Sequence, residues 1–374
     1  MLIQNKKIYI HGVSACCSAG RTSENIFKSI LSGTSGIKKY TGYLINGEEC
    51  VIGRMDFNTT FDTLLANNVK EVLAKSSLKN FKNTLLLVGT SVGGMTWAEK
   101  QFIEDDGSYE NIKLEKQSMQ SIALALKQQF TFKDAITFST ACTSSSNAIV
   151  FAKEILESGA YTDVLVVGAD SISYTTVNGF NALGVLSKEC SIPFDANRTG
   201  MNVAEGIGVL LLSTEPSDIQ LLGVGCSSDA YNITHPQPEG NGAKLAMHNA
   251  LKDASLEAKE IDYINAHGTG TVANDTSEGK AILELFPHHP FVGSTKSITG
   301  HTLGACGAIE AIISIQVLKQ QIVPGNLDLK TKELEALNAL KENKQTEVNT
   351  VLSNAFAFGG NNVSIILQRV VNEN

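Results

Sequence analysis

The stretch AITFSTACTSSSN, residues 135–147, decides how this chain is expected to fold around its chemistry. It begins as an apolar run from Ala135 to Phe138, turns through small hydroxyl-bearing residues and enters a helical pattern at Asn147. This order predicts a strand, a turn and a helix, with Cys142 at the helix start. There the free N–H groups and the helix dipole favour the thiolate, which is the nucleophilic form of cysteine.

Two further segments place a histidine on a glycine-rich turn. NAHGTGT carries His267, and KSITGH ends in His301. One activated cysteine with two distant histidines is typical of an acyl-transfer enzyme that works through a thioester. Thr269 and Thr271 add hydroxyls at alternating positions, which suits hydrogen bonding to an amide-bearing arm. The other histidines are interpreted as ordinary surface or core residues: His11, His235, His248, His288 and His289.

A lysine and a glutamate accompany the second histidine. Lys296 precedes His301 by five residues, and Glu310 lies in the helical pattern that follows. The pair is either an ordinary salt bridge or, within a pocket, a support that keeps the histidine neutral or oriented.

The stretch FAFGGNN, residues 356–362, separates two apolar strands near the end of the chain. One interpretation is a hairpin turn whose glycines supply positive φ angles. The functional interpretation is that Gly359 and Gly360 let the loop swing Phe358.

Composition bounds the class of protein. The 374 residues are 43% hydrophobic and 18% charged, which is typical of a globular protein with one large or two fused cores. The net charge of −8 disfavours nucleic acid as a partner. An odd number of cysteines, seven, favours a reducing cytoplasm, and the absence of CxxC or Cys/His ligand spacing predicts no metal site. No window is apolar enough to predict a membrane span.

The chain shows a faint internal duplication. IYIHGV from Ile8 is similar to IQLLGV from Ile219, and three later apolar strands recur in the same order in both halves. Strands alternating with helical patterns indicate buried, largely parallel sheets covered by helices. Chance similarity of short apolar strands is the alternative. In such folds reactive groups gather where loops leave the carboxyl ends of strands. The helical patterns cover residues 22–31, 147–157, 242–254 and 303–318.

Together these motifs resemble the β-ketoacyl-[acyl-carrier-protein] synthases of the thiolase superfamily, in particular the type with a Cys-His-His active site. The similarity runs from Phe138 to Leu367 and includes IPFDANRTGMNVAEGIGVLLL, STKSITGHTLGACGAIEA and SNAFAFGGNN. The first 130 residues match more loosely and look shortened. The resemblance implies an α/β, thiolase-like fold of two duplicated βαβαβαββ halves in a five-layered αβαβα arrangement. Residues 1–215 would carry the nucleophilic cysteine and residues 216–374 both histidines.

The resemblance implies a decarboxylative Claisen condensation of an acyl thioester with malonyl-carrier protein, in fatty-acid or polyene/polyketide elongation. Cys142 would hold the acyl chain, and His267 and His301 would stabilise the enolate left by decarboxylation. Backbone N–H groups of Cys142 and Phe358 would form a second oxyanion hole, and Phe358 would gate access. Lys296 and Glu310 would support the histidines, and Thr269 and Thr271 would bind the phosphopantetheine arm. Val92 would line the acyl tunnel, and Gly359 and Asn362 would contact the substrate. Arg198 would dock the carrier protein.

Acyl carrier protein is the partner that the resemblance implies. It would deliver both acyl and malonyl groups on phosphopantetheine, so no separate cofactor is expected. Carrier proteins are acidic, and docking to a chain at −8 is expected to use a local basic patch. The resemblance also implies a cytoplasmic dimer, formed with itself or with a related subunit that lacks the cysteine. Arg198 is the best candidate for docking the carrier protein, and the weaker candidates are Arg54, Lys38 and Lys39. The alternative is that these residues are ordinary solvated surface charges.

Three related classes fit less well. A thiolase would carry a second cysteine in a Cys-x-Gly loop, which residues 353–362 lack. A Cys-His-Asn synthase would lack His301. A non-catalytic partner subunit of the chain-length-factor type would have lost Cys142, and it stays the alternative function. Three residues depart from the usual family pattern: Asn361 replaces a threonine, Ala357 a glycine and Thr199 an aspartate.

Overall fold

The computed structural model describes residues 6–76, 78, 81 and 83–370, and it contains one ten-stranded sheet. The strand order is β10-β9-β13-β14-β8-β1-β7-β6-β4-β5. The five strands from the first half of the chain are β1 (Ile8–Cys17), β4 (Thr84–Gly89), β5 (Asp134–Phe138), β6 (Asp163–Asp170) and β7 (Gly206–Ser213). The five from the second half are β8 (Ile219–Ser228), β9 (Tyr263–Asn265), β10 (Phe291–Gly293), β13 (Thr350–Phe356) and β14 (Asn361–Arg369).

The two sets of five strands repeat one topology. In the first half β5, β4 and β6 are parallel neighbours, followed by antiparallel β7 and β1. In the second half β10, β9 and β13 are parallel, followed by antiparallel β14 and β8. The sets join where β1 pairs with β8 through Ile8 and Leu221. The four expected strand equivalences therefore occupy matching places, and we propose that the halves divide in the connection between Ser213 and Ile219.

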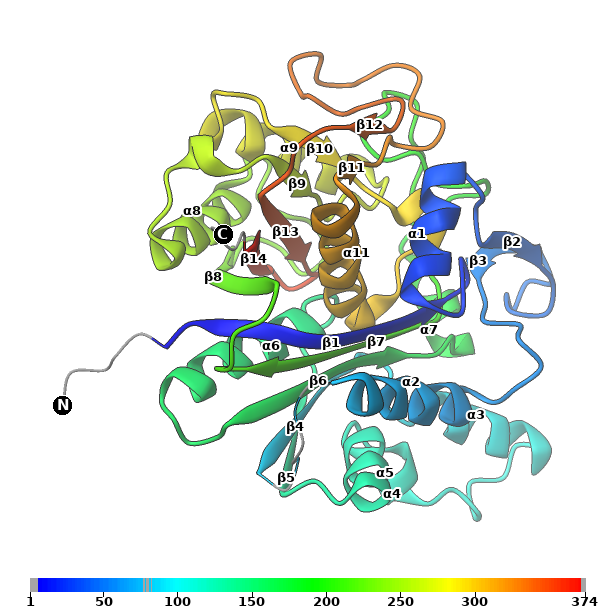
Figure 1. Cartoon of the computed structure of the whole chain (residues 1–374). Coiled ribbons are helices and arrows are strands. Elements are labelled where there is room, and N and C mark those ends of the chain that lie inside the picture. The colour runs from blue at the N-terminus through cyan, green and yellow to red at the C-terminus, as the bar shows by residue number, and fades with distance from the viewer. Residues whose placement is uncertain (1–5, 77, 79–80, 82, 371–374) are drawn as a thin grey trace.

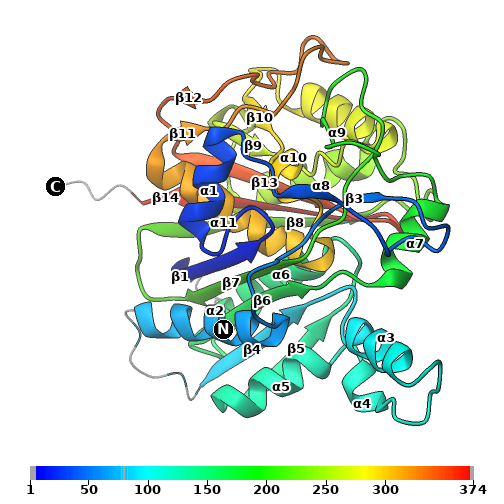
Figure 2. The ribbon, with the colours of Figure 1, turned by 90° about the vertical axis from the view of Figure 1, so that its right-hand side faces the viewer.

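Helices form three layers around the two halves of the sheet (Figures 1 and 2). Helices α2 and α5 cover the outer face of the first half, α1, α6 and α11 lie between the halves, and α8 with α9 covers the second half. This is the expected five-layered arrangement. The helices are α1 (Ser23–Ser32), α2 (Phe61–Lys75), α3 (Met95–Glu104), α4 (Leu114–Gln117), α5 (Ser121–Phe130), α6 (Ser144–Glu157), α7 (Tyr174–Ala182), α8 (Asn241–Ala254), α9 (Val272–Leu285), α10 (Lys296–Thr299) and α11 (Cys306–Gln320).

Helix α11 is the centre of the core. Every residue from Cys306 to Leu318 is buried, because both halves of the sheet pack on this helix. Glycine permits the close approach: a Cβ at Gly168 or Gly208 would lie 2.9 Å from the side chain of Ala308. The segment Leu303–Gln320 is long and apolar enough to cross a membrane, yet 89% of it is buried inside the protein. Burial in the core accounts for its composition.

Smaller elements complete the fold. Two short antiparallel pairs lie outside the main sheet, and two short 3₁₀ turns precede β9 and α11. They are β2 (Ile37–Tyr40) with β3 (Cys50–Gly53), β11 (Ile322–Val323) with β12 (Lys344–Gln345), and the turns Ala258–Glu260 and Leu303–Ala305.

Candidate active site

Cys142 lies on the tight turn between β5 and α6. Ala141 has a φ of 53°, in the left-handed region that residues with a Cβ rarely adopt. The Ser144 hydroxyl holds the turn, because it accepts from the Thr140 N–H at 2.9 Å and donates to the Ala141 carbonyl at 2.6 Å. The turn presents the Cys142 side chain to a cavity and keeps it 8% exposed. The predicted strand, turn and helix are all present.

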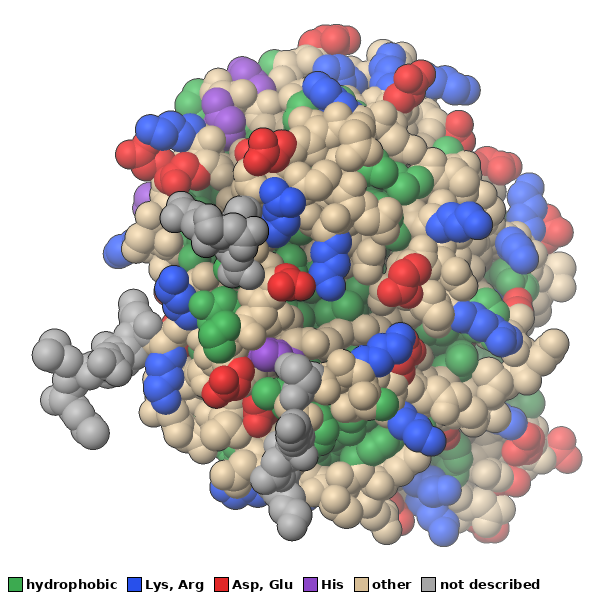
Figure 3. Space-filling view, viewed as in Figure 1, with side chains coloured by type: hydrophobic (Ala, Val, Ile, Leu, Met, Phe, Trp, Pro, Cys, Tyr) green, Lys and Arg blue, Asp and Glu red, His purple; other side chains and the backbone are tan. Residues whose placement is uncertain are grey.

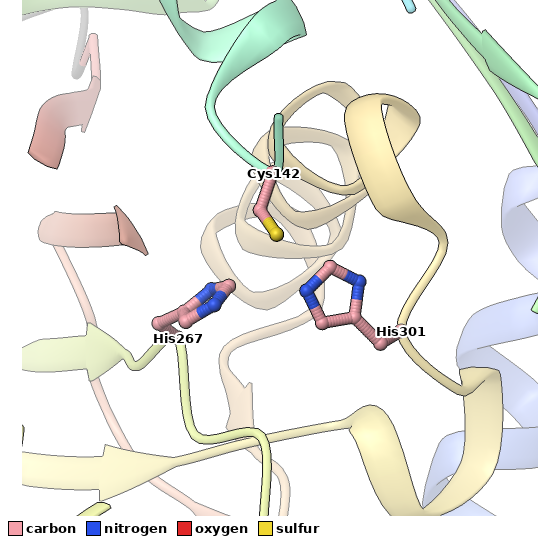
Figure 4. A group of neighbouring side chains, drawn as sticks. All are labelled: Cys142, His267 and His301. Atoms are coloured by element: carbon pink, nitrogen blue, oxygen red, sulfur yellow. The ribbon is translucent and has the colours of Figure 1, made fainter. Parts of the chain in front are cut away.

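The Cys142 thiol points between the imidazoles of His267 and His301 (Figure 4). The sulfur and one nitrogen from each ring lie within 4.8 Å of one another. The two ring centroids are 5.3 Å apart, and the ring planes are nearly perpendicular. Three loops, each following a different strand of the sheet, thus bring the three residues to one point.

His301 is a neutral hydrogen-bond donor. Its Nδ1 accepts the Leu303 N–H at 3.0 Å, so the ring proton lies on Nε2. Burial, with the nearby Lys296 charge, lowers the pKa of His301 to about 3. The ring therefore stays uncharged near neutral pH and offers its Nε2–H to a ligand.

His267 is also a neutral imidazole that offers its Nε2–H. Burial lowers the pKa of His267 well below its usual value, and the Lys296 charge and His301 add to the effect. The Lys296 ammonium lies 3.4 Å from Nδ1 of His267 and donates to the His267 carbonyl oxygen at 2.5 Å. A cation beside Nδ1 favours the lone pair there, which leaves the ring proton on Nε2.

Lys296 and Glu310 form an ion pair beneath the histidines. Both side chains are almost fully buried, and the ammonium donates to a Glu310 carboxylate oxygen. Burial raises the pKa of Glu310 to about 7, although Lys296 opposes the rise. Because the ammonium also contacts His267, the pair connects α11 to the first histidine loop. The expected pairing is present, and its catalytic role stays a prediction.

Glu278 is a buried carboxylate that sequence reasoning missed. From α9 it accepts the N–H groups of His267 and Gly268, each at 2.8 Å, and the Asn354 amide at 3.0 Å. These contacts fix the backbone of the His267 loop. No sequence pattern indicates these contacts, because a glutamate on a helix is usually solvated.

Asp170 is a second buried carboxylate that was missed. It lies at the end of β6 and accepts the Thr90 hydroxyl and the Val92 N–H with one oxygen and the Gly304 N–H with the other. Burial raises its pKa to about 6. The carboxylate ties the loop after β4 to the loop after His301.

The hairpin between β13 and β14 forms the other wall of the site. Gly359 and Gly360 have φ angles of 85° and 78°, which glycine adopts readily. The Phe358 ring packs 5.9 Å from Phe180 of α7, centroid to centroid. Burial raises the pKa of the Cys142 thiol, and the backbone N–H groups of Cys142 and Phe358, which contact the thiol, oppose that rise. The oxyanion hole expected from these two N–H groups stays a prediction.

A cavity of about 60 Å³, partly open to solvent, is lined by the three reactive residues. Thr269 and Thr271 lie in its wall, with their hydroxyls 2.9 Å apart. Asn362 also lines it and donates to Asp229 at 2.6 Å. The wall consists of Cys142, Phe180, Val185, Met201, Asp229, Thr234, His235, Pro236, His267, Thr269, Thr271, Ala273, Asn274, His301, Phe356, Ala357, Phe358, Gly359 and Asn362.

Val92 lies behind this wall. It is 2% exposed and packs in an apolar cluster with Met201 and Leu303. Met201 belongs to this cluster and also lines the cavity. The tunnel role expected for Val92 stays a prediction, since Val92 is not among the described residues of the cavity wall.

Asn361, where the family usually has threonine, contacts the nucleophile turn. Its side-chain oxygen accepts from the Thr143 hydroxyl and the Asn147 amide, each at 3.0 Å. The end of the gating hairpin is therefore bonded to the start of α6.

The expected thiolate of Cys142 is wrong for the free protein. The helix start is present, but burial outweighs it and raises the pKa of Cys142 to about 12, against the opposing Lys296 charge. The resting nucleophile is a neutral thiol, so its proton must leave as the carbon–sulfur bond forms.

Alkylation of Cys142 by iodoacetamide should accordingly rise about tenfold per pH unit from pH 7 to pH 10 without a plateau, because only the thiolate reacts. Peptide mass spectrometry of time points at each pH measures the rate. The exposed Cys226 provides an internal comparison. A plateau below pH 8 at Cys142 would contradict the raised pKa.

The expected docking role of Arg198 is also wrong, because the side chain is buried. It donates to the carbonyls of Asp195 and Val272, each at 2.9 Å, and to Glu333 at 2.7 Å, and it lies 3.6 Å from Asp275. The arginine holds the start of α9. Of the weaker docking candidates, Arg54 pairs with Asp56 and Lys39 pairs with Glu189. Lys38 is exposed. Figure 3 shows acidic and basic side chains interspersed over one face of the molecule.

Arg198→Ala should therefore lower the free energy of unfolding by about 3–5 kcal/mol, because it leaves buried Asp275 without its cation. Chemical denaturation measures the change. Lys39→Ala is the control and should change stability by less than about 1 kcal/mol, since its pair is exposed. An unchanged denaturation midpoint for Arg198→Ala would refute the structural role.

The reactive residues also offer ligand atoms of the kind that zinc uses. One group is Cys142, His267 and His301, and another is His267, Cys306 and Glu310. In the second group Glu310 already binds the Lys296 ammonium, which opposes a cation there. That no metal takes part stays a prediction.

The fold and the site together define an acyltransferase that works through a cysteine thioester. Family models of the β-ketoacyl synthase N-terminal and C-terminal domains match residues 54–217 and 219–330. The chain belongs to the β-ketoacyl synthase family.

Curated relatives are similar along the whole chain. The chain is 30% identical to 3-oxoacyl-[acyl-carrier-protein] synthase 2 of Synechocystis, covering 98% of this chain and 99% of the relative. The Staphylococcus aureus enzyme of the same name is also 30% identical, with the same coverage. The Synechocystis alignment spans 416 residues against the 374 of this chain, so it contains gaps in this chain. The expected shortening of the first 130 residues stays a prediction.

Solved structures of ketosynthases are similar to this chain in fold. A chain from a ketosynthase in complex with its chain length factor, from Xenorhabdus doucetiae, is 32% identical with a TM-score of 0.91, covering 98% of this chain and 99% of that one. A β-ketoacyl synthase from Burkholderia phymatum is 26% identical with a TM-score of 0.86, covering 98% and 100%.

Proposed function

We propose that this protein is a β-ketoacyl-[acyl-carrier-protein] synthase that condenses a Cys142-bound acyl group with malonyl-carrier protein. The observation that carries the proposal is the convergence of one thiol and two neutral Nε2–H donors at the inner end of one cavity. A covalent acyl carrier and a two-donor enolate site are the two parts that such a condensation requires.

In the first half-reaction the Cys142 sulfur attacks the thioester carbonyl of the acyl-carrier protein. The tetrahedral oxyanion is held by the N–H groups of Cys142 and Phe358. The carbon–sulfur bond to the carrier breaks, and the carrier thiolate takes the proton that Cys142 loses. The acyl group is then a thioester on Cys142.

In the second half-reaction malonyl-carrier protein occupies the same cavity. Its carboxylate leaves as carbon dioxide, and the electron pair of that bond becomes an enolate of the remaining thioester. Nε2–H of His267 and of His301 hold the enolate oxygen. Because both rings are neutral, they stabilise the enolate without protonating its carbon. The carbon attacks the acyl carbonyl, and the carbon–sulfur bond to Cys142 breaks, which releases a β-ketoacyl-carrier protein. Cys142 leaves as the thiolate and takes a proton from solvent water, which restores the neutral thiol.

The substrates are proposed to arrive on the phosphopantetheine arm of an acyl carrier protein in the cytoplasm. The cavity supports this, because Thr269 and Thr271 place a pair of hydroxyls in the same wall as Cys142. The names of the curated relatives specify carrier-linked substrates for those proteins. The acyl chain belongs to fatty-acid or to polyene and polyketide elongation.

A second candidate function is that of a partner subunit. The Xenorhabdus doucetiae chain comes from a complex of a ketosynthase with a chain length factor, which makes a heterodimer as reasonable a proposal as a homodimer. The intact Cys142, His267 and His301 favour the catalytic role within either dimer.

Purified protein incubated with acyl-carrier and malonyl-carrier protein tests the proposal. We expect release of carbon dioxide and a carrier-bound β-ketoacyl product, measured by mass spectrometry of the carrier. Absence of product with the protein alone, but formation of product with an added cysteine-containing relative, would support the partner role instead.

A further inference from the structure

His235 lines the cavity at its exposed outer end and takes no part in the reaction described above. It belongs to the loop after β8 and is solvent-exposed, while its neighbours Thr234 and Pro236 line the same cavity. Among the described residues of the cavity wall there is no lysine or arginine. His235 is therefore the group at the mouth best able to bind an anion, whereas the sequence suggested an ordinary histidine.

The loop that carries His235 is held in a defined conformation. The Asn232 side-chain oxygen accepts the N–H groups of Thr234 at 2.9 Å and of His235 at 3.3 Å. The Gly359 N–H donates to the Ile233 carbonyl at 2.7 Å. Through this bond the loop is attached to the hairpin that carries Phe358.

The imidazole of His235 is oriented by its neighbour. Its Nδ1 lies 2.9 Å from the Thr234 hydroxyl, and that hydroxyl donates its own proton to the Asn232 side-chain oxygen at 3.3 Å, so Nδ1–H is the donor to Thr234. No atom of the residues that the structure describes bonds to Nε2 of His235. In the protonated imidazole both ring nitrogens carry a proton, and Nε2 is then the donor that an anion at the cavity can use.

The acidic side chain in the described part of the cavity wall, Asp229, already accepts hydrogen bonds with both carboxylate oxygens. One Asp229 oxygen accepts the Asn362 amide at 2.6 Å, and the other accepts the Gln237 N–H at 2.9 Å. The carboxylate is thus engaged within its own loop and the hairpin, and it leaves the His235 donor available to an anion.

We propose that His235 and Thr234 form a subsite that binds the phosphate group of the phosphopantetheine arm. The inference rests on the proposed function, because the arm reaches Cys142 past Thr269 and Thr271 and carries its phosphate at the opposite end. An imidazole donor to a phosphate oxygen is a charge-assisted hydrogen bond. His235 is a binding residue here, and it acts on the affinity for the arm and not on the chemical step.

Three thioesters of one acyl group show whether the phosphate contributes to binding. They are acyl-pantetheine, which has no phosphate, and acyl-phosphopantetheine and acyl-coenzyme A, which carry it. The readout is the rate of Cys142 acylation as a function of thioester concentration, followed by intact-protein mass spectrometry. For the wild type we expect a KM about tenfold lower for the two phosphate-bearing thioesters than for acyl-pantetheine, as for a hydrogen bond to a charged group.

His235→Ala should raise the KM for both phosphate-bearing thioesters about tenfold. It should leave the limiting rate, and the KM for acyl-pantetheine, unchanged. His235→Lys should retain the preference, because it restores a cationic donor. His248→Ala is the matched control, since His248 is exposed on α8 outside the cavity wall.

An equal KM for all three thioesters in the wild type would overturn the subsite while leaving the proposed function intact. The subsite would also be overturned if His235→Ala raised the KM for acyl-pantetheine as much as the KM for acyl-phosphopantetheine, because the loss of affinity would then have a structural cause. Failure of every thioester to acylate Cys142 in the wild type would instead overturn the proposed function.

Discussion

Cys142→Ala is expected to abolish condensation, because Cys142 is the one thiol among the described residues of the cavity wall. Decarboxylation of malonyl-carrier protein should survive, since it needs only the Nε2–H donors of His267 and His301. Carbon dioxide release and the mass of the carrier-bound product, measured in one reaction, separate the two steps.

The matched control for this substitution is Cys226→Ala, which removes an exposed thiol outside the described cavity wall, with its sulfur 3.9 Å from the Asn147 side-chain oxygen. It should leave both steps at the wild-type rate. Residual condensation by Cys142→Ala above the background without enzyme would contradict the assignment of the nucleophile.

His267→Ala and His301→Ala are each expected to lower the rate of decarboxylation by about 10²–10³, the usual loss for one oxyanion donor. Acylation of Cys142 should be retained in part, because its oxyanion is held by backbone N–H groups of Cys142 and Phe358. Radiolabelled carbon dioxide release measures the first step, and intact-protein mass measures the second.

His248→Ala serves as the control for the histidine variants, and thermal melts establish that each variant is folded. A variant of either site histidine that decarboxylates at the wild-type rate would remove that residue from the enolate site. Equal loss of acylation and decarboxylation would mean that the substitution had disturbed the nucleophile turn.

Much of the architecture could be predicted because the sheet is buried on both faces. Strands such as β6 and β4 are continuous apolar runs, and their order repeats in β13 and β9. Parallel strands bring their carboxyl ends to one edge, so the loops carrying Cys142 and the histidines were expected to meet.

What failed in the sequence interpretation depended on burial and long-range contacts. The family resemblance suggested Arg198 as a docking residue, but its side chain is buried and pairs with Glu333 and Asp275. The helix start at Cys142 suggested a thiolate, but burial raises the pKa of the thiol. Burial dominates a helix-terminus effect, which falls off within one turn.

The residues that were missed share one property: their partners lie far away in sequence. Glu278 and Asp170 bond to loops that follow other strands, and His235 reaches the cavity because Gly359 holds its loop. No local pattern distinguishes such residues from solvated side chains.

Trapping the acyl-enzyme tests the central claim most directly. The protein is incubated with acyl-carrier protein, digested and mapped by mass spectrometry, and malonyl-carrier protein is added to a parallel sample. The account predicts one acyl group, located on Cys142, which disappears on malonyl addition as an equal amount of β-ketoacyl-carrier protein forms. An acyl group on another cysteine, or one on Cys142 that persists after malonyl addition, would contradict it.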